Sequence, residues 1–286
     1  MRASDKNIGF LHGFFLTLTC SLTLALGSCV PVDQLPPGMV PQGPTSGVPT
    51  ASFPDLDQGG LSETSAHFII KAYSQADMDA LKLLAENEFT KIGADTGLYS
   101  YMSSLNFLIV AYRDHDEFMK KTHEPVWSHV AISSTALYCY YPDPDLEPTM
   151  AHFMTHMVFR GYLGGKASTL RWLDEGLAMS EEVAKMSDAD RINYSNSKAS
   201  QLRQNRMPFS QMTFFVTNTE EKRRTDSWYQ QVESVTTYLL AQGSPLAFAQ
   251  FLSELRSVEI DQALSDAYAA RFRNLADLEG AWKYTI

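Results

Sequence analysis

Two histidines, His152 and His156, lie four residues apart in an apolar segment with helical character. In a helix this spacing puts both imidazoles on one face, about 40° apart around the axis and one turn removed. Two imidazoles placed in this way can present nitrogen atoms to a single metal ion. The spacing alone is a weak signal, because histidines four residues apart also occur as ordinary buried or exposed side chains.

A carboxylate further along the chain strengthens the metal interpretation. Glu175 lies nineteen positions after His156, within the sequence WLDEGLA of residues 172–178. Two histidines from one helix and a glutamate from the following helix make a three-ligand zinc site that leaves a fourth position open. The sequence therefore predicts a Zn²⁺ site in which His152, His156 and Glu175 are the ligands.

Taken together, the two segments resemble the gluzincin zinc metallopeptidases, especially those with a peptidase MA-like domain. That family combines H-E-x-x-H with W-L-[DN]-E-G-[LF]-A at this separation. The resemblance covers residues 65–285, loosely outside the motif, and implies a zincin-like fold with His152, His156 and Glu175 on zinc. Asp174, which precedes the glutamate, is expected to have a structural role within its own helix.

The resemblance also reaches a helix that begins near Tyr229. In related aminopeptidases, a tyrosine at this position donates a hydrogen bond to the tetrahedral oxyanion, so Tyr229 is a candidate for that role. The alternative interpretation is an aromatic side chain that faces the core.

The sequence departs from the family pattern at Phe153, which replaces the glutamate of H-E-x-x-H. In the family this glutamate is the general base, and such a base contributes about 10²–10⁴-fold to the rate. Phenylalanine has no ionisable group and cannot take or return a proton. Met179 stands where some gluzincins carry a carboxylate that supports a metal-binding histidine, although another group could fill that role. Glu182 is two turns beyond Glu175, about 10 Å along the axis, so it is a poor replacement base.

Three functions remain open at this point. The first is a degenerate metallopeptidase that binds zinc, hydrolyses little or no peptide, and holds a peptide or stabilises its own fold with the metal. The second is an active zinc-dependent peptidase that uses another base. The third is a metal-free protein-interaction module on the same fold.

The elements that must position these residues follow from hydrophobic periodicity. Strands and helices alternate early in the chain, and helices dominate after residue 147, which predicts an α+β protein. Residues 61–165 form an α/β half with a small mixed sheet and the histidine helix, and residues 166–286 form an all-helical half. Strands are expected at 67–73, 106–112 and within 131–141, and helices at 75–92, 114–121, 228–242, 246–256, 260–271 and 275–285.

The first residues have the pattern of a targeting segment. Arg2 and Lys6 precede an apolar run at 8–26, which is typical of a secretory signal peptide. The run ends in Leu-Gly-Ser before Cys29, which resembles the lipobox of bacterial lipoproteins and implies cleavage after residue 28 and acylation of Cys29. The alternative is an uncleaved membrane helix. Either interpretation predicts an extracytoplasmic, membrane-anchored protein, and Val30 after the cysteine implies the outer membrane in a Gram-negative source.

Residues 29–60 are expected to form a disordered tether. Residues 30–60 hold seven of the chain's thirteen prolines and five of its sixteen glycines, with no Lys or Arg. Such a segment buries too little apolar surface to offset its ordering entropy, although a docked arm is the alternative.

Composition limits the partners and the redox chemistry. The formal net charge is −10, from 23 basic and 33 acidic residues, which argues against nucleic acid. The expected partners are a lipid membrane, through acylated Cys29, and a peptide or protein. Only three cysteines are present, so no disulfide framework is expected, and Cys139 is predicted to be a buried free thiol.

Overall fold

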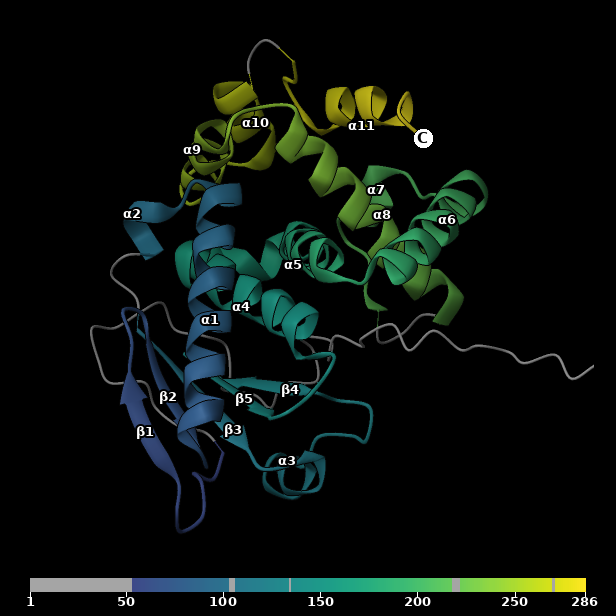
Figure 1. Ribbon diagram of the computed structural model, residues 1–286. Helices are drawn as coiled ribbons and strands as arrows, with labels where there is room; N and C mark the ends of the chain where they lie inside the picture. The colour runs from purple at the N-terminus through teal and green to yellow at the C-terminus, as the bar shows by residue number, and fades with distance from the viewer. Residues whose placement is uncertain (1–52, 103–105, 134, 218–221, 269–270) are drawn as a thin grey trace, which may run out of the picture.

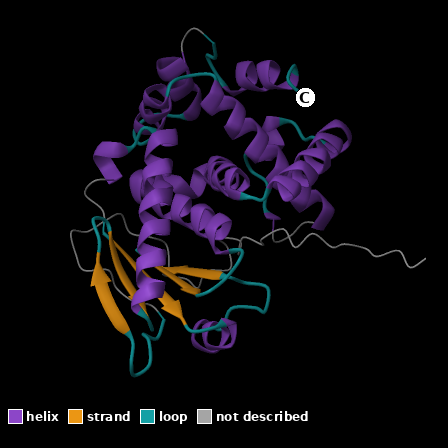
Figure 2. Cartoon of the chain, in the orientation of Figure 1, coloured by secondary structure: helices purple, strands orange, loops and turns teal. Residues whose placement is uncertain are grey.

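The computed structural model describes residues 53–102, 106–133, 135–217, 222–268 and 271–286. It is a mixed α+β protein, as predicted, with a five-stranded sheet in the N-terminal part and helices in the rest (Figures 1 and 2). The expected signal peptide, Cys29 and most of the expected tether lie outside these residues. None of the described helices is both long and apolar enough to cross a membrane.

Within the described residues the strands are β1 (Leu61–Thr64), β2 (Phe68–Ala72), β3 (Phe107–Tyr112), β4 (Val130–Ser133) and β5 (Ala136–Tyr140). The helices of the N-terminal part are α1 (Gln75–Thr96), α2 (Tyr99–Met102) and α3 (His115–Thr122). The later helices are α4 (Leu146–Leu163), the 3-10 helix η2 (Gly164–Leu170), α5 (Arg171–Lys185), α6 (Asp188–Asn205), α7 (Phe209–Met212), α8 (Lys222–Ala241), α9 (Pro245–Leu255), α10 (Ile260–Tyr268) and α11 (Leu275–Lys283).

The sheet has the order β1-β2-β3-β5-β4. Its centre is parallel, because β3 pairs with β2 and β5 in that sense, whereas β1 and β4 are antiparallel edge strands. Every residue of β3 is buried, as expected for an apolar strand with helices on both faces. The sequence pattern missed β1, and it merged the hairpin of β4 and β5 into a single strand.

Local signals fix the helix ends. The Ser74 side chain accepts a hydrogen bond from the Asp77 backbone N–H, so Ser74 is the N-cap of α1. Helix α1 runs four residues beyond the predicted end and stops at Gly97, whose φ of 70° favours glycine. Helix α8 includes Lys222, six residues before the predicted start at 228, and Lys222 and Asp226 pair across one turn.

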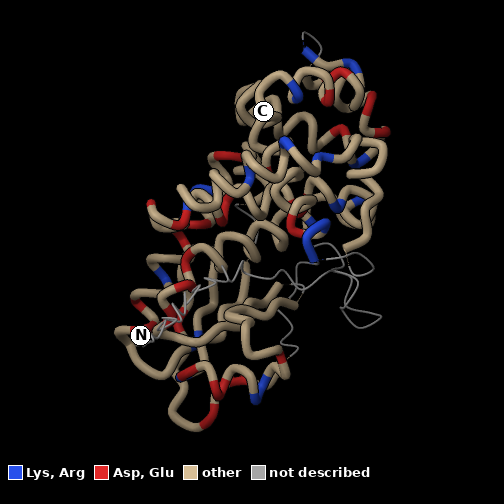
Figure 3. Tube along the Cα trace, turned by 90° about the vertical axis from the view of Figure 1, so that its right-hand side faces the viewer, with Lys and Arg blue, Asp and Glu red and all other residues tan. Residues whose placement is uncertain are grey.

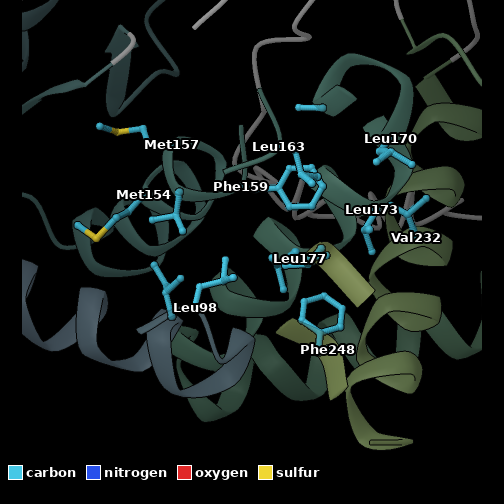
Figure 4. Close-up of a cluster of buried hydrophobic side chains, with 14 of the residues drawn as sticks. Leu98, Met154, Met157, Phe159, Leu163, Leu170, Leu173, Leu177, Val232 and Phe248 are labelled. Atoms are coloured by element: carbon cyan, nitrogen blue, oxygen red, sulfur yellow. The ribbon is translucent and has the colours of Figure 1, made fainter. Parts of the chain in front are cut away.

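Two clusters of buried side chains lie on opposite faces of the sheet. The larger one joins the α1 and α4 side of the sheet to the helical part, and Figure 4 shows side chains of α4, α5, α8 and α9 meeting within it. The smaller one lies under α3 and includes Tyr112, Phe118 and Tyr138, with Phe53 and Leu56 packed against it. Helix α4 is thus enclosed between the sheet and the later helices.

Residues 53–57, the last part of the expected tether, lie against the outer face of the sheet. The Phe53 ring packs edge-on against Tyr138, with centroids 5.0 Å apart. The Tyr112 hydroxyl donates a hydrogen bond to the Pro54 carbonyl at 2.6 Å, and the Asp57 N–H donates one to the Tyr73 hydroxyl at 2.9 Å. The folded unit therefore includes this short arm, since its backbone is held by Tyr138 of β5, Tyr112 of β3 and Tyr73 just after β2.

Candidate metal centre

Helices α4 and α5 bring His152, His156 and Glu175 together. The Nε2 atoms of the two histidines are 3.0 Å apart, and His156 Nε2 lies 3.5 Å from Glu175 Oε2. One ligand atom from each of the three residues lies within 4.8 Å of the others. All three residues are at least 98% buried. The structure therefore forms the cluster that the spacing predicted.

The packing of α5 on its other side explains a glycine next to this cluster. A Cβ at Gly176 would lie 2.2 Å from Thr236 Oγ1 and 2.5 Å from the Val232 carbonyl oxygen on α8. Any larger residue would force the two helices apart. Gly176 thus lets α5 approach α8 closely while the neighbouring Glu175 points toward α4.

Each histidine has a carboxylate at its other ring nitrogen. Asp174 Oδ1 lies 2.7 Å from His156 Nδ1, and its second oxygen accepts a hydrogen bond from Arg160 Nε at 2.7 Å. Glu182 Oε2 lies 2.8 Å from His152 Nδ1. The expectation that Asp174 acts only within its own helix was therefore wrong, because its carboxylate reaches across to α4. Such contacts set the tautomer and the orientation of metal-binding histidines.

The donor set fits a cation. With Nδ1 directed at a carboxylate, each neutral imidazole carries its lone pair on Nε2, and the two Nε2 atoms face each other. Two facing lone pairs repel unless a proton or a cation lies between them. Nitrogens bound tetrahedrally to zinc at about 2.0–2.1 Å lie about 3.3 Å apart, close to the spacing of these atoms.

The buried carboxylate of Glu175 is a second observation that favours a cation at this site. Among the described residues, no group donates a hydrogen bond to either of its carboxylate oxygens, although the side chain is fully buried. Arg171 Nε approaches only to 4.0 Å, and the terminal nitrogens of Arg171 bind the Phe215 carbonyl and the Thr217 hydroxyl. Buried carboxylates are normally paired or bound to metals, so this one favours a cation.

The electrostatics of the cluster agree with this interpretation. Burial acts to raise the pKa of Glu175, but His156, His152 and Arg160 together hold that pKa well below its ordinary value. Burial and Arg160 act to lower the pKa of His156, and the carboxylates of Asp174 and Glu175 outweigh them and raise it. The neighbouring groups thus favour the ionised form of Glu175, and a metal ion bound here would compete with a proton for His156.

Phe153 lies at the side of the cluster, half-buried. Its ring centroid is 5.3 Å from that of His152 and 6.3 Å from that of His156. The described carboxylates in contact with the two histidines are Glu175, Asp174 and Glu182, and the last two lie at the Nδ1 edges, away from Nε2. None of these three takes the place of the missing base, and Met179 is a buried apolar residue.

Tyr229 is half-buried on α8, where its ring packs edge-on against Trp228. Helix α8 touches α5 at Gly176 through Val232, one turn beyond Tyr229. The helix therefore runs beside the cluster, and the oxyanion role of Tyr229 stays a prediction.

A second group of metal-binding residue types was not predicted. His129 lies with Asp143 and Asp145 near the end of β5. His129 Nδ1 is 2.9 Å from both Asp143 Oδ2 and the Tyr140 hydroxyl, and Asp143 Oδ1 accepts a hydrogen bond from the Asp145 N–H. These hydrogen bonds fix the turn that follows β5, and they explain why the three residues lie close together. No periodic spacing in the sequence links its members.

Cys139 is fully buried in β5, as predicted. Comparison of the chain with protein-family models and with curated proteins gave no match. The functional argument therefore depends on the chemistry of the α4–α5 cluster.

Proposed function

We propose that this chain is a zinc-binding protein whose site has the ligand set of the gluzincin metallopeptidases and which hydrolyses little or no peptide. The observation that carries the proposal is the cluster of His152, His156 and Glu175, with a buried carboxylate that lacks hydrogen-bond donors among the described residues. His152 and His156 would bind through Nε2 and Glu175 through a carboxylate oxygen. Bound zinc supplies Lewis-acid polarisation and fold stabilisation.

The low expected activity follows from Phe153. Peptide hydrolysis needs a group that takes a proton from the attacking water and returns it to the leaving amine. Phe153 lies beside both histidines and does neither. The alternative of an active peptidase needs a base from elsewhere, and the alternative of a metal-free module leaves the buried Glu175 oxygens without a hydrogen-bond donor among the described residues.

The position of strand β4 at the edge of the described sheet supports the proposal that the protein holds a peptide. It is the last strand of the described sheet beside β5, so one of its sides has no strand partner there. Extended peptides bind such edges through main-chain hydrogen bonds. Helix α4 packs against β4, which brings the edge near the histidines.

We also propose that the protein is an extracytoplasmic lipoprotein anchored through acylated Cys29, because residues 1–29 carry the signal and lipobox pattern. Metabolic labelling with a radioactive fatty acid tests this. The wild type should be labelled and Cys29→Ser should not. A labelled Cys29→Ser protein would refute the assignment.

The metal proposal is tested by elemental analysis of protein purified without added metal. We expect about one equivalent of zinc, as for a structural or catalytic site of three protein ligands. Less than about a tenth of an equivalent, with no uptake of added Zn²⁺, would favour the metal-free module.

The catalytic proposal is tested with Phe153→Glu in a peptide-library cleavage assay. Restoring the base should raise cleavage by about 10²-fold or more, and Phe153→Gln, which has similar size and no base, should stay inactive. If the wild type cleaves as fast as Phe153→Glu and both need His152, the protein is an active peptidase and the proposal is wrong.

A further inference from the structure

We propose that Glu182 is a positioning residue of the metal centre, whose carboxylate holds the His152 ring so that Nε2 faces the cation. This inference rests on the proposed zinc-binding function. The starting observation is the 2.8 Å contact between Glu182 Oε2 and His152 Nδ1, two atoms on different helices. Both side chains are at least 90% buried, so water competes weakly for either partner.

The geometry of α5 explains how Glu182 reaches His152. Glu182 follows Glu175 by seven residues, which is close to two helical turns, so both side chains lie on the face of α5 toward α4. His152 is one turn before His156 on α4. The two helices therefore present their residues in matched pairs, His156 with Glu175 and His152 with Glu182. Met179, one turn after Glu175, is apolar and cannot hold a histidine. Glu182, in the following turn, takes this role.

The side of the ring that Glu182 contacts decides its role. Nδ1 and Nε2 lie on opposite edges of the imidazole, and Nε2 of His152 faces His156. A carboxylate at Nδ1 is thus directed away from the cation, and it can neither ligate the metal nor accept a proton from a group bound there. What it can do is fix the Nδ1–H tautomer and increase the basicity of Nε2.

Asp174 provides an internal comparison, because it makes the same contact with His156. Arg160 holds Asp174 in place through an ion pair of 2.7 Å. The centre therefore has one carboxylate for each histidine. Loss of a partner of this kind weakens metal binding by about 10- to 100-fold in known sites.

The test compares Glu182→Gln with Glu181→Gln. The two glutamates are neighbours on α5 and both are buried, but Glu181 pairs with Lys91 on α1 instead of a histidine. Zn²⁺ dissociation constants should rise by about 10- to 100-fold for Glu182→Gln and remain within about twofold for Glu181→Gln. The visible absorption spectrum of bound Co²⁺ should change only in Glu182→Gln, because only that variant alters the orientation of a ligand.

Equal affinity and an unchanged Co²⁺ spectrum in Glu182→Gln would overturn the inference and leave the zinc site intact. Failure of the wild type to bind Zn²⁺ or Co²⁺ would overturn the proposed function itself. Circular dichroism checks that each variant is folded. If Glu182→Gln does not fold, Glu182→Asp keeps the charge and shortens the side chain, and its affinity should fall between those of the wild type and a variant without the carboxylate.

Discussion

Charged residues of helix α5 reach both α1 and α4, and they meet the two helices in different ways. Toward α1, Glu181 pairs with Lys91, and Lys185 pairs with Glu88 of α1. The two buried carboxylates of this contact thus each have a lysine from the chain. Toward α4, Asp174 pairs with Arg160, whereas Glu175 faces the His156 imidazole at 3.5 Å.

The difference shows how a site can be distinguished from a structural ion pair. Figure 3 shows acidic and basic residues interspersed along the described chain, so buried acids have cations available to them. Between α1 and α5 each of the two buried carboxylates has a lysine of the chain within salt-bridge distance. At Glu175 the Arg171 guanidinium, on α5 itself, stays 4.0 Å away, and a bound metal ion would complete the contacts of this carboxylate.

The largest expected effect is on Glu175 itself. Glu175→Gln should abolish stabilisation by zinc, which for the wild type is about 4 kcal/mol when Zn²⁺ is at about 1,000 times its dissociation constant. Thermal melts with and without Zn²⁺ measure this. Glu88→Gln is the matched control, since Glu88 is equally buried and paired with a lysine, and it should keep the zinc-dependent increase in Tm. A zinc-dependent increase in Glu175→Gln would contradict the ligand assignment.

A smaller effect is expected on the α1 side. Lys91→Met leaves Glu181 buried without its cation and should lower the free energy of unfolding by about 2 kcal/mol. This is below the value for fully buried pairs, because Lys91 is one-third exposed. Urea unfolding measures the loss, and zinc affinity should not change. Lys222→Met, which removes an exposed pair with Asp226, should cost less than about 0.5 kcal/mol.

A further prediction concerns the pH dependence of stability. Burial, with a further contribution from Asp95, raises the pKa of Glu181 to about 7, although Lys91 acts to lower it. The folded chain thus keeps a proton that the unfolded chain releases near pH 4.5. The stability from this group is full at low pH and is lost as the pH rises toward about 7. Urea unfolding across this range should show a shallower slope in Glu181→Gln, and an identical slope would contradict the assignment.

The sequence predicted the site better than its surroundings. His152, His156 and Glu175 could be found because helical spacing and a short motif depend on local geometry alone. The contact between Glu182 and His152 could not, because it depends on how α5 is rotated against α4, which the core sets. The contact of Asp174 with His156 on α4 could not be predicted from the sequence for the same reason.

The secondary structure was also predicted in part, because long elements were found and short ones were missed. Long periodic segments such as α1 and the apolar strand β3 were found, and their ends were correct to within a few residues. The short edge strands β1 and β4 were missed because four residues give almost no periodicity and their pairing partners supply the structure. Residues 53–57 have the composition of a linker, yet hydrogen bonds with the hydroxyls of three tyrosines hold them against the sheet.

That arm has a practical consequence for anyone who shortens the protein. Composition suggests cutting at residue 61, after the last of the proline- and glycine-rich stretch. The cut would uncover the rings of Tyr138 and Tyr112 and remove the backbone that Lys121 binds at Asp55. Newly exposed aromatic surface of this kind promotes aggregation. Protein that begins at or before Phe53 should remain soluble and monodisperse at concentrations where a version beginning at Leu61 precipitates.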